Sequence, residues 1–99
     1  IDYFKVKVNE NAKKILAKIN GLNPSPGAWF IHKKIRYKIW RAMINDKNGF
    51  PGTILDNKFV IACGVKSLEV IEIQKEGKIK LPLKIFLQGI KFEQGEKVK

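Results

Sequence analysis

The sequence contains very little cysteine and histidine. Cys63 is the single cysteine, so an internal disulfide is excluded, and a lone thiol beside Ala62 and Gly64 is typical of a small buried hydrophobe. One cysteine and one histidine, His32, cannot supply the four ligands of a structural zinc site. No spacing places a base beside the thiol, so nothing argues for a nucleophilic cysteine. This cysteine usage suits a reducing cytosol, and we expect a cytoplasmic location.

Long apolar runs are missing as well. No stretch approaches the roughly 18 residues that a membrane-spanning helix needs, so we expect no membrane partner. No basic segment followed by an apolar one indicates a signal peptide at the N-terminus. The chain begins at Ile1 without a methionine, which suggests a piece excised from something longer. Its 99 residues, 44% of them hydrophobic, suffice for one domain, expected over residues 1–99.

The sequence also lacks a recognisable catalytic arrangement. It has no paired carboxylates in a known motif, no phosphate-cradling glycine loop and no Ser-His-Asp set. The isolated acidic residues Glu69, Glu72 and Glu76 are typical of solvated charges. We therefore expect these 99 residues to carry neither catalytic residues nor a cofactor or metal of their own.

Acidic residues are scarce, and this is the strongest signal in the composition. Twenty Lys and Arg against nine Asp and Glu give a net charge of +11 and a pI of about 9.9, which indicates a polyanionic partner. Arg36 and Arg41 are the only arginines, and lysine suits phosphate attraction better than bidentate reading of bases. The alternative is that an AT-rich genome favours lysine codons and that the lysines only keep the protein soluble.

The N-terminal part predicts an extended entry segment followed by one helix. Residues 1–8 contain no turn residues, and Asn9 or Asn11 suits the N-cap of a helix that runs to Asn20. Gly21 is the expected C-terminal stop. The apolar stripe of this helix consists of Ala12, Ile15, Leu16 and Ile19.

A rigid corner follows the helix. Pro24 and Pro26 each fix φ and push the preceding residue out of the α region. Gly27 then permits a turn that a Cβ would obstruct. The chain is expected to run extended through this corner and to enter a strand at Trp29.

From Trp29 the apolar residues alternate, which predicts one long strand, with Lys33 marking a turn or a bulge. One face would carry Ile31, Ile35, Tyr37 and Ile39, and the other His32, Lys34, Arg36 and Lys38. The aromatic residues near this strand suit either base stacking or buried packing, and we expect buried packing. These aromatic residues are Trp29, Phe30, Tyr37 and Trp40.

The rest of the chain predicts short strands and a second helix. Strands are expected over residues 53–55, 58–62 and 68–73, with a tight hairpin at Asp56-Asn57. Pro82 would begin a helix over residues 83–88 that ends at Gly89, and the tail can add a turn and a last strand. The pattern predicts a mainly β fold with two helices: a small, OB-like, partly closed β-barrel with a leading α-helix.

Six segments in this order carry a family resemblance. They are NPSPGAWF at 23–30, KIWRA at 38–42, PGTI at 51–54, IACG at 61–64, IQKEGK at 73–78 and FLQG at 86–89. The ordered set resembles the C-terminal domain of methionyl-tRNA formyltransferases. Two departures stand out, because Ser25 takes a place where the family often has an aromatic residue, and Ile79 separates Lys78 from Lys80.

The resemblance implies a division of labour. An N-terminal formyltransferase domain of the same parent chain would bind 10-formyltetrahydrofolate and carry the catalytic residues. The basic OB-like domain would help to hold initiator methionyl-tRNA. Two alternatives stay open: the C-terminal domain of a sugar-nucleotide formyltransferase, and a free-standing module that binds single-stranded nucleic acid. The high positive charge favours tRNA.

Seven basic residues are the candidate nucleic-acid contacts. Three of them alternate on one predicted strand face, roughly 6.6–7 Å apart, which is comparable to the separation of successive phosphates. The others lie beyond the predicted strand end at Gln74 or after the second helix. The candidates are Lys34, Arg36, Lys38, Lys75, Lys78, Lys80 and Lys91. The alternative is an exposed face that lysine keeps soluble. Lys5, Lys7 and Lys13 are expected to lie away from the strand face.

Overall fold

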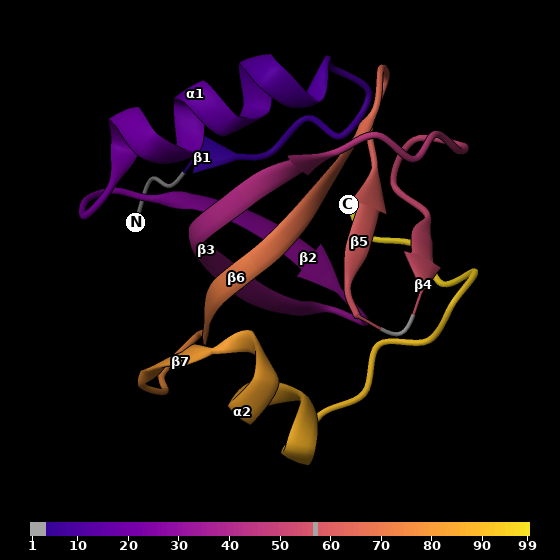
Figure 1. Ribbon diagram of the computed structural model, residues 1–99. Coiled ribbons are helices and arrows are strands. Elements are labelled where there is room, and N and C mark those ends of the chain that lie inside the picture. The colour runs from indigo at the N-terminus through magenta and orange to yellow at the C-terminus, as the bar shows by residue number, and fades with distance from the viewer. Residues whose placement is uncertain (1–3, 57) are drawn as a thin grey trace.

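The computed structural model describes residues 4–56 and 58–99. Seven strands form one strongly curved sheet in the order β1-β2-β3-β6-β5-β4, with β7 paired to β6, and two helices lie at opposite ends (Figure 1). The elements are β1 (Phe4–Lys5), α1 (Ala12–Leu22), β2 (Ala28–His32), β3 (Ile35–Asn45), β4 (Ile54–Asp56), β5 (Val60–Ala62), β6 (Ser67–Lys75), β7 (Lys80–Pro82) and α2 (Leu83–Gly89).

The first helix begins where its N-cap predicts and ends later than expected. The Asn11 side chain accepts a hydrogen bond from the Lys13 backbone N–H, as a capping residue does. Ala12, Ile15 and Ile19 of the predicted stripe are buried against the sheet. The expected stop at Gly21 is wrong, because α1 continues to Leu22 and the extended residue Asn23 caps it.

The corner after α1 is anchored to β3 through one side chain. The Asn23 amide nitrogen donates to the backbone carbonyls of Ile19, Ile39 and Trp40, at 2.9, 3.3 and 3.1 Å. The last two carbonyls belong to the stretch of β3 where the pairing with β6 shifts register. The corner is therefore held at a β-bulge. Gly27, at φ +83°, provides the predicted turn into β2.

The predicted long strand is two strands joined by a hairpin turn. β2 and β3 are antiparallel, with His32 opposite Ile35, and the turn residues Lys33 and Lys34 have φ of 48° and 69°. Lys33 thus marks the turn that the sequence allowed, and the prediction of a continuous strand is wrong. As a result, Lys34 does not share a strand with Lys38.

The C-terminal tail closes the barrel. Its backbone bonds to β2 on one side, where Ile31 and Lys99 exchange two hydrogen bonds of 2.8 Å. On the other side Glu96 accepts from the Ile54 N–H and Val98 donates to the Gly52 carbonyl, each at 2.8 Å. The tail makes the predicted turn at Gly95 and then bridges the two edges of the sheet, with only an isolated bridge in place of the predicted last strand.

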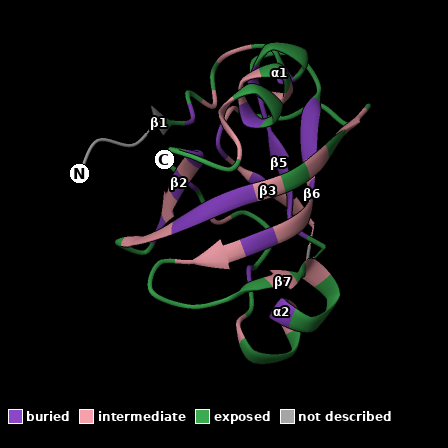
Figure 2. Ribbon diagram, turned by 90° about the vertical axis from the view of Figure 1, so that its left-hand side faces the viewer, coloured by how far each residue is buried: buried purple, intermediate pink, exposed green. Residues whose placement is uncertain are grey.

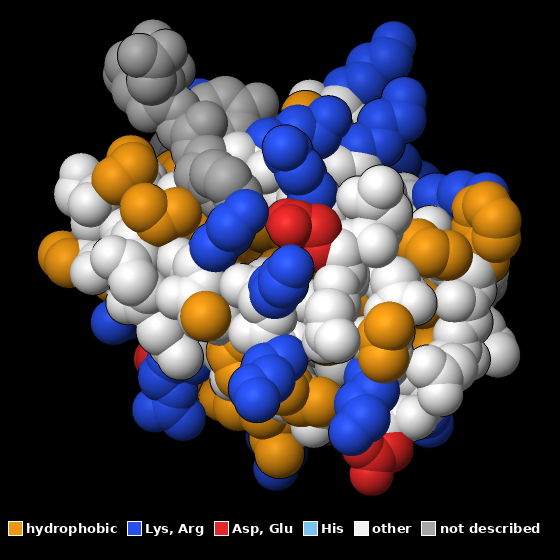
Figure 3. Space-filling view, turned by 90° about the horizontal axis from the view of Figure 1, so that it is seen from above, with side chains coloured by type: hydrophobic (Ala, Val, Ile, Leu, Met, Phe, Trp, Pro, Cys, Tyr) orange, Lys and Arg blue, Asp and Glu red, His pale blue; other side chains and the backbone are white. Residues whose placement is uncertain are grey.

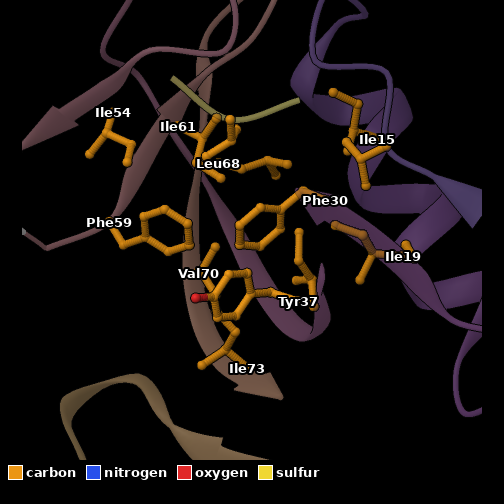
Figure 4. Packing of buried hydrophobic residues seen from close by; sticks show 14 of the residues in the cluster. Ile15, Ile19, Phe30, Tyr37, Ile54, Phe59, Ile61, Leu68, Val70 and Ile73 are labelled. Carbon is orange, nitrogen blue, oxygen red and sulfur yellow. The ribbon is translucent and has the colours of Figure 1, made fainter. Parts of the chain in front are cut away.

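The core is a continuous cluster that fills the barrel and extends under α1 and α2 (Figure 4). Its centre is a set of aromatic rings: Phe30 lies 5.3 Å from Tyr37 and 5.2 Å from Phe59, and Phe59 stacks on Phe92 at 3.9 Å between centroids. Cys63 is buried as predicted, and burial raises the pKa of its thiol to about 11. A thiol in that environment is not a nucleophile at neutral pH.

Burial is distributed unevenly over the elements (Figure 2). The buried residues lie mostly along the strands and on one side of α1, whereas the turns are exposed. In α2 the single buried residue is Phe86, so this helix contacts the barrel through a narrow face. The buried residues therefore hold the sheet in place, and its exposed side chains face outward.

The structure confirms a mainly β fold with two helices and a small, OB-like, partly closed barrel behind a leading helix. The predicted strands over 53–55, 58–62 and 68–73 and the helix after Pro82 all form, with adjusted ends. Asn57, and with it part of the predicted hairpin turn, lies outside the described residues. The short strands β1 and β7 are additions to the sequence prediction. No helix within the described ranges is long and apolar enough to cross a membrane.

Candidate nucleic-acid interface

A row of polar and aromatic side chains crosses the sheet on its outer side. Trp29 pairs with Lys38, Lys38 with Gln74, and Gln74 with Lys80, so the row runs over β2, β3, β6 and β7. On the far edge Lys5 of β1 pairs with Trp29. Directly paired residues share a face of a sheet, and their chain neighbours face the core. We call the face that carries this row the outer face.

Trp40 lies on the outer face between two lysines. The Lys38 and Lys80 ammonium groups lie 3.9 and 4.7 Å from the centre of its ring system. Its indole N–H donates to the Gln74 side-chain oxygen at 2.8 Å. The side chain is half-buried and is not part of the core cluster. The expectation that Trp40 is core packing is therefore wrong.

Trp29 has a similar environment on the neighbouring strand. The Arg36 guanidinium carbon lies 5.2 Å from the centre of its ring system, and its indole N–H donates to the Pro26 carbonyl at 3.0 Å. Trp29 is half-buried and also lies outside the core cluster, so the expectation of core packing is wrong for it as well. The other two aromatic residues, Phe30 and Tyr37, are core residues as predicted. The sheet thus sends two aromatic side chains inward and two outward.

Lys38 is the most enclosed of the seven candidate residues. Its side chain is 7% exposed, it passes over Gly27, and its ammonium group donates to the Pro24 carbonyl. Burial lowers the pKa of Lys38, and the charge of Lys80 lowers it further. The expected exposed stripe on one strand face is therefore absent: Lys34 lies in a turn, Lys38 is buried, and Arg36 pairs with Glu76.

Lys75, Lys78 and Lys80 lie at the end of β6, in the following turn and on β7. Gln74 ties this turn to the sheet, because its amide nitrogen donates to the Lys78 carbonyl at 2.8 Å. Within the described ranges, none of the three lysines has a carboxylate at ion-pair distance. Lys75 and Lys78 line an open groove of about 600 Å³, which also includes the exposed side chains of Ile79 and Ile85.

The structure places two of the candidates away from this cluster. Lys34 is exposed in the β2–β3 turn and lines a groove with Lys33, Lys97 and Lys99. Lys91 follows α2 and lines a different groove with Glu93 and Gln94. The outer face and the adjoining β6–β7 turn therefore bring together Arg36, Lys38, Lys78 and Lys80. Lys75 lies at the end of β6 on the opposite face, because it pairs with the core residue Tyr37, and Lys34 and Lys91 lie at separate positions.

Sequence reasoning missed two residues that organise the interface. Asn23 fixes the corner that covers Lys38, and Gln74 holds both Trp40 and the β6–β7 turn. The signal for Asn23 was an amide between the end of a helix and a proline, where side-chain bonds to nearby backbone are common. Gln74 had no comparable signal, because its role depends on the pairing of three strands.

Positive charge extends well beyond the outer face. Figure 3 shows lysine and arginine side chains spread over the end of the molecule that α1 occupies, with few acidic side chains between them. The nine acidic residues cannot pair with all 20 basic ones. A surface of this kind attracts polyanions over the range of a Debye length.

Comparison with known proteins identifies related domains. Residues 2–91 match the family model described as formyl transferase, C-terminal domain. A methionyl-tRNA formyltransferase of Pelagibacter ubique is 44% identical over 94 residues, covering 94% of this chain and 30% of that protein. The methionyl-tRNA formyltransferase of Lactobacillus johnsonii is 39% identical over 104 residues, covering 98% of this chain and 33% of that protein. The chain thus spans about a third of the length of these relatives.

Solved structures show the same fold in a more distant protein. The crystal structure of HypX from Aquifex aeolicus in complex with tetrahydrofolic acid matches with a TM-score of 0.71 and 20% identity. The match covers 84% of this chain and 16% of that chain. At this identity the likeness shows the fold alone.

Proposed function

The chain belongs to the formyl transferase C-terminal domain family, and from that premise we propose that residues 1–99 form the tRNA-holding domain of a methionyl-tRNA formyltransferase. In this proposal the domain binds initiator methionyl-tRNA mainly through its phosphates. An N-terminal domain of the same parent chain binds 10-formyltetrahydrofolate and transfers the formyl group. The reaction takes place in the cytoplasm, where translation begins.

The observation that carries this proposal is the row of side chains across the outer face. The row places Lys5, Trp29, Lys38, Gln74 and Lys80 side by side at the spacing of neighbouring strands, about 4.8 Å, and Trp40 lies beside it between Lys38 and Lys80. Lys75, Lys78 and Lys80 supply point charges for phosphates, since they have no carboxylate partner within the described ranges. The flat rings of Trp29 and Trp40, each with a cation against it, offer surfaces on which an unpaired base can stack.

The seven candidate residues take different roles in this proposal. Lys80, Lys75 and Lys78 contact phosphates directly, and Arg36 does so by exchanging its partner Glu76 for a phosphate. Lys38 does not contact the RNA and instead positions its neighbours, because it holds the corner at Pro24 and supports the Trp40 ring. Lys34 and Lys91 contribute at the edges of the interface.

A titration of this chain with initiator and elongator tRNAs at several salt concentrations tests the proposal. We expect log K to fall with log[salt], with a slope of about 0.7–0.9 per phosphate contacted. Preference for the initiator should be weak, because lysine carries little base specificity. A flat salt response would contradict binding through phosphates, and a strong initiator preference would show that bases are read.

In the parent enzyme the same contacts should act on substrate binding. We expect Lys75→Glu/Lys78→Glu/Lys80→Glu to raise KM for tRNA far more than it lowers kcat. The reason is that these groups hold substrate and transition state alike. An equal fall in kcat at saturating tRNA would instead indicate that the domain positions the reacting end.

A second candidate function is favoured by the two outward indoles. Rings flanked by cations on an OB-like sheet are also typical of modules that bind single-stranded nucleic acid without a folded partner. Binding of an unstructured oligouridylate as tightly as tRNA, at equal salt, would favour this function. Weaker binding of the oligouridylate supports the tRNA-holding domain.

A further inference from the structure

Two shallow grooves meet at the C-terminal tail, away from the cluster around Trp40. One, of about 410 Å³, is lined by residues 5–9 and Lys99. The other, of about 200 Å³, is lined by Ile31, Lys33, Lys34, Lys97 and Lys99. Lys99 lines both grooves, so the two lie side by side, and we call the pair the tail groove. It connects the segment after β1, the tail and the β2–β3 turn.

The tail groove is strongly basic. Its lysines are Lys5, Lys7, Lys33, Lys34, Lys97 and Lys99, all exposed. Glu96 lies beside the tail groove and accepts hydrogen bonds from Lys33 at 2.8 Å and from His32 at 3.1 Å. Its negative charge is therefore paired with these two residues and does not offset the other lysines. Lys97 lies over the exposed Phe50 ring at 4.3 Å. Among the described residues, the other five lysines have no acidic side chain at ion-pair distance, so the repulsion between them is not offset by paired carboxylates.

The tail groove is continuous with the outer face through β2. Ile31 pairs with Arg36 on one edge and exchanges hydrogen bonds with Lys99 on the other. Two residues earlier, Trp29 lies between Lys38 and Lys5. Moving from strand to strand therefore leads from Lys80, over the indoles, directly into the tail groove. The basic and indole side chains are therefore aligned across the strands and not along a single strand.

We propose that the tail groove binds the phosphodiester backbone of the same RNA that the outer face holds. The RNA path then crosses the strands of the barrel from β7 to the C-terminal tail, and Lys7, Lys34 and Lys99 each neutralise phosphates at its far end. This inference rests on the proposed tRNA-holding function. Phosphate is the fitting ligand because the groove is shallow, its charges are lysines and no aromatic ring lines it.

The position of Lys5 differs from the sequence expectation. Lys5 and Lys7 were both expected to lie away from the strand face, yet Lys5 pairs with Trp29. Lys7 lies outside the strands, but both residues line the tail groove. They are therefore unsuitable as a neutral comparison. A better comparison is Lys58 with Lys84. Both are exposed, lack side-chain partners among the described residues, and line a groove between β6 and α2.

The test compares two double variants of equal net charge, Lys7→Glu/Lys99→Glu and the control Lys58→Glu/Lys84→Glu. Binding of a fluorescently labelled initiator tRNA transcript is measured from low to physiological salt, after thermal melts have shown that both variants fold like the parent. The groove variant should bind at least about tenfold more weakly and lose about one to two units of salt slope. The control should bind within about threefold of the parent.

Other outcomes overturn the proposal in distinguishable ways. An equal loss of tRNA affinity in the two variants would mean that the positive charge attracts RNA as a diffuse field and that the tail groove is not a binding site. Unchanged binding by the groove variant, with loss in Lys75→Glu/Lys80→Glu, would remove the groove and leave the proposed function intact. Failure of the parent chain to bind tRNA would overturn both. Tighter binding of polyglutamate than of tRNA to the parent, abolished in the groove variant, would assign the groove to an acidic protein segment.

Discussion

At the scale of single residues, truncation of Trp40 should lower the free energy of unfolding less than truncation of a core aromatic residue. Truncating a fully buried aromatic such as Phe30, which is 0% exposed, costs about 3–5 kcal/mol. Trp40 is half-buried and has one indole hydrogen bond, so Trp40→Ala should lower the free energy of unfolding by only about 1–3 kcal/mol. Urea denaturation of Trp40→Ala beside Phe30→Ala measures the difference.

The folded Trp40→Ala variant should also bind tRNA more weakly than the parent. A loss of stability equal to that of Phe30→Ala, with normal tRNA binding, would return Trp40 to the core and contradict its place in the interface.

Substitution by alanine should change the stability in opposite directions at two glycines, because their surroundings differ. Gly21 lies within α1, and no heavy atom lies within 4 Å of the position that a Cβ would take, so Gly21→Ala should stabilise the chain by about 0.5–1 kcal/mol. A Cβ on Gly64 would lie 2.0 Å from the Asn9 carbonyl oxygen, so Gly64→Ala should destabilise it by at least about 2 kcal/mol. Thermal melts of the two variants check both signs. A neutral Gly64→Ala would show that the segment before α1 does not approach Gly64 so closely.

Glu96 should make the folded state less stable at acid pH. Its hydrogen bond to Lys33, supported by the Glu93 backbone N–H and by His32, lowers the pKa of Glu96 from 4.5 to about 2. A carboxyl whose pKa is lower in the folded state stabilises that state above its unfolded pKa, and this contribution is lost as pH falls from about 4.5 towards 2. Melting temperatures of the parent and Glu96→Gln should therefore differ at pH 6 and converge near pH 2. A constant difference across that range would contradict the assignment.

At the scale of elements, the β2–β3 hairpin shows where a sequence pattern stops being informative. Two-residue turns of this kind need positive φ at both positions and usually contain Asn-Gly or a similar pair. Here Lys33 and Lys34 occupy those positions, so the strongest sequence signal for a hairpin is missing. The chain reversal was not predicted, because the sheet rather than local preference imposes it.

After the turn the alternation was predicted correctly, since Tyr37 and Ile39 are buried core residues. Before the turn the two faces were predicted the wrong way round: His32 is buried and packs on Phe92, whereas Ile31 pairs with Arg36 on the outer face.

The C-terminal tail is the element on which barrel closure depends. Removing residues 96–99 deletes its hydrogen bonds to Ile31, Ile54 and Gly52 and exposes the pocket of the buried Val98. At about 0.5–1.5 kcal/mol for each of these four hydrogen bonds, with about 1.5–3 kcal/mol added for the buried side chain, the deletion should cost about 4–9 kcal/mol. Denaturant unfolding and loss of hydrogen-exchange protection at the Ile31 and Ile54 amides measure this cost.

Lys99→Ala provides the matched control for this deletion. It keeps the backbone bonds to Ile31 and should change stability by less than about 0.5 kcal/mol. If the deletion leaves the unfolding midpoint unchanged, the tail does not close the barrel.

At the scale of the whole molecule, the sequence predicted the fold class better than the interface. The apolar periods of α1 and of the strands are local, and they specify which side chains are buried. Closure of the barrel by the tail depends on contacts between distant segments, which no local pattern contains. For the same reason, the sequence identified the positive charge but placed three of the seven candidates along one strand. In the structure the sheet aligns Lys38 with Lys80 across the strands, with Gln74 between them.

The most direct test of the proposed function asks whether RNA contacts the outer face. The chain has two tryptophans, so the indole N–H region of its ¹H–¹⁵N NMR spectrum should contain one signal each from Trp29 and Trp40. Titration with initiator tRNA should shift or broaden both signals at low salt, and added salt should reverse the change. If tRNA binds and shifts other amide signals while both indole signals stay in place, the RNA lies elsewhere on the domain and the central claim is wrong.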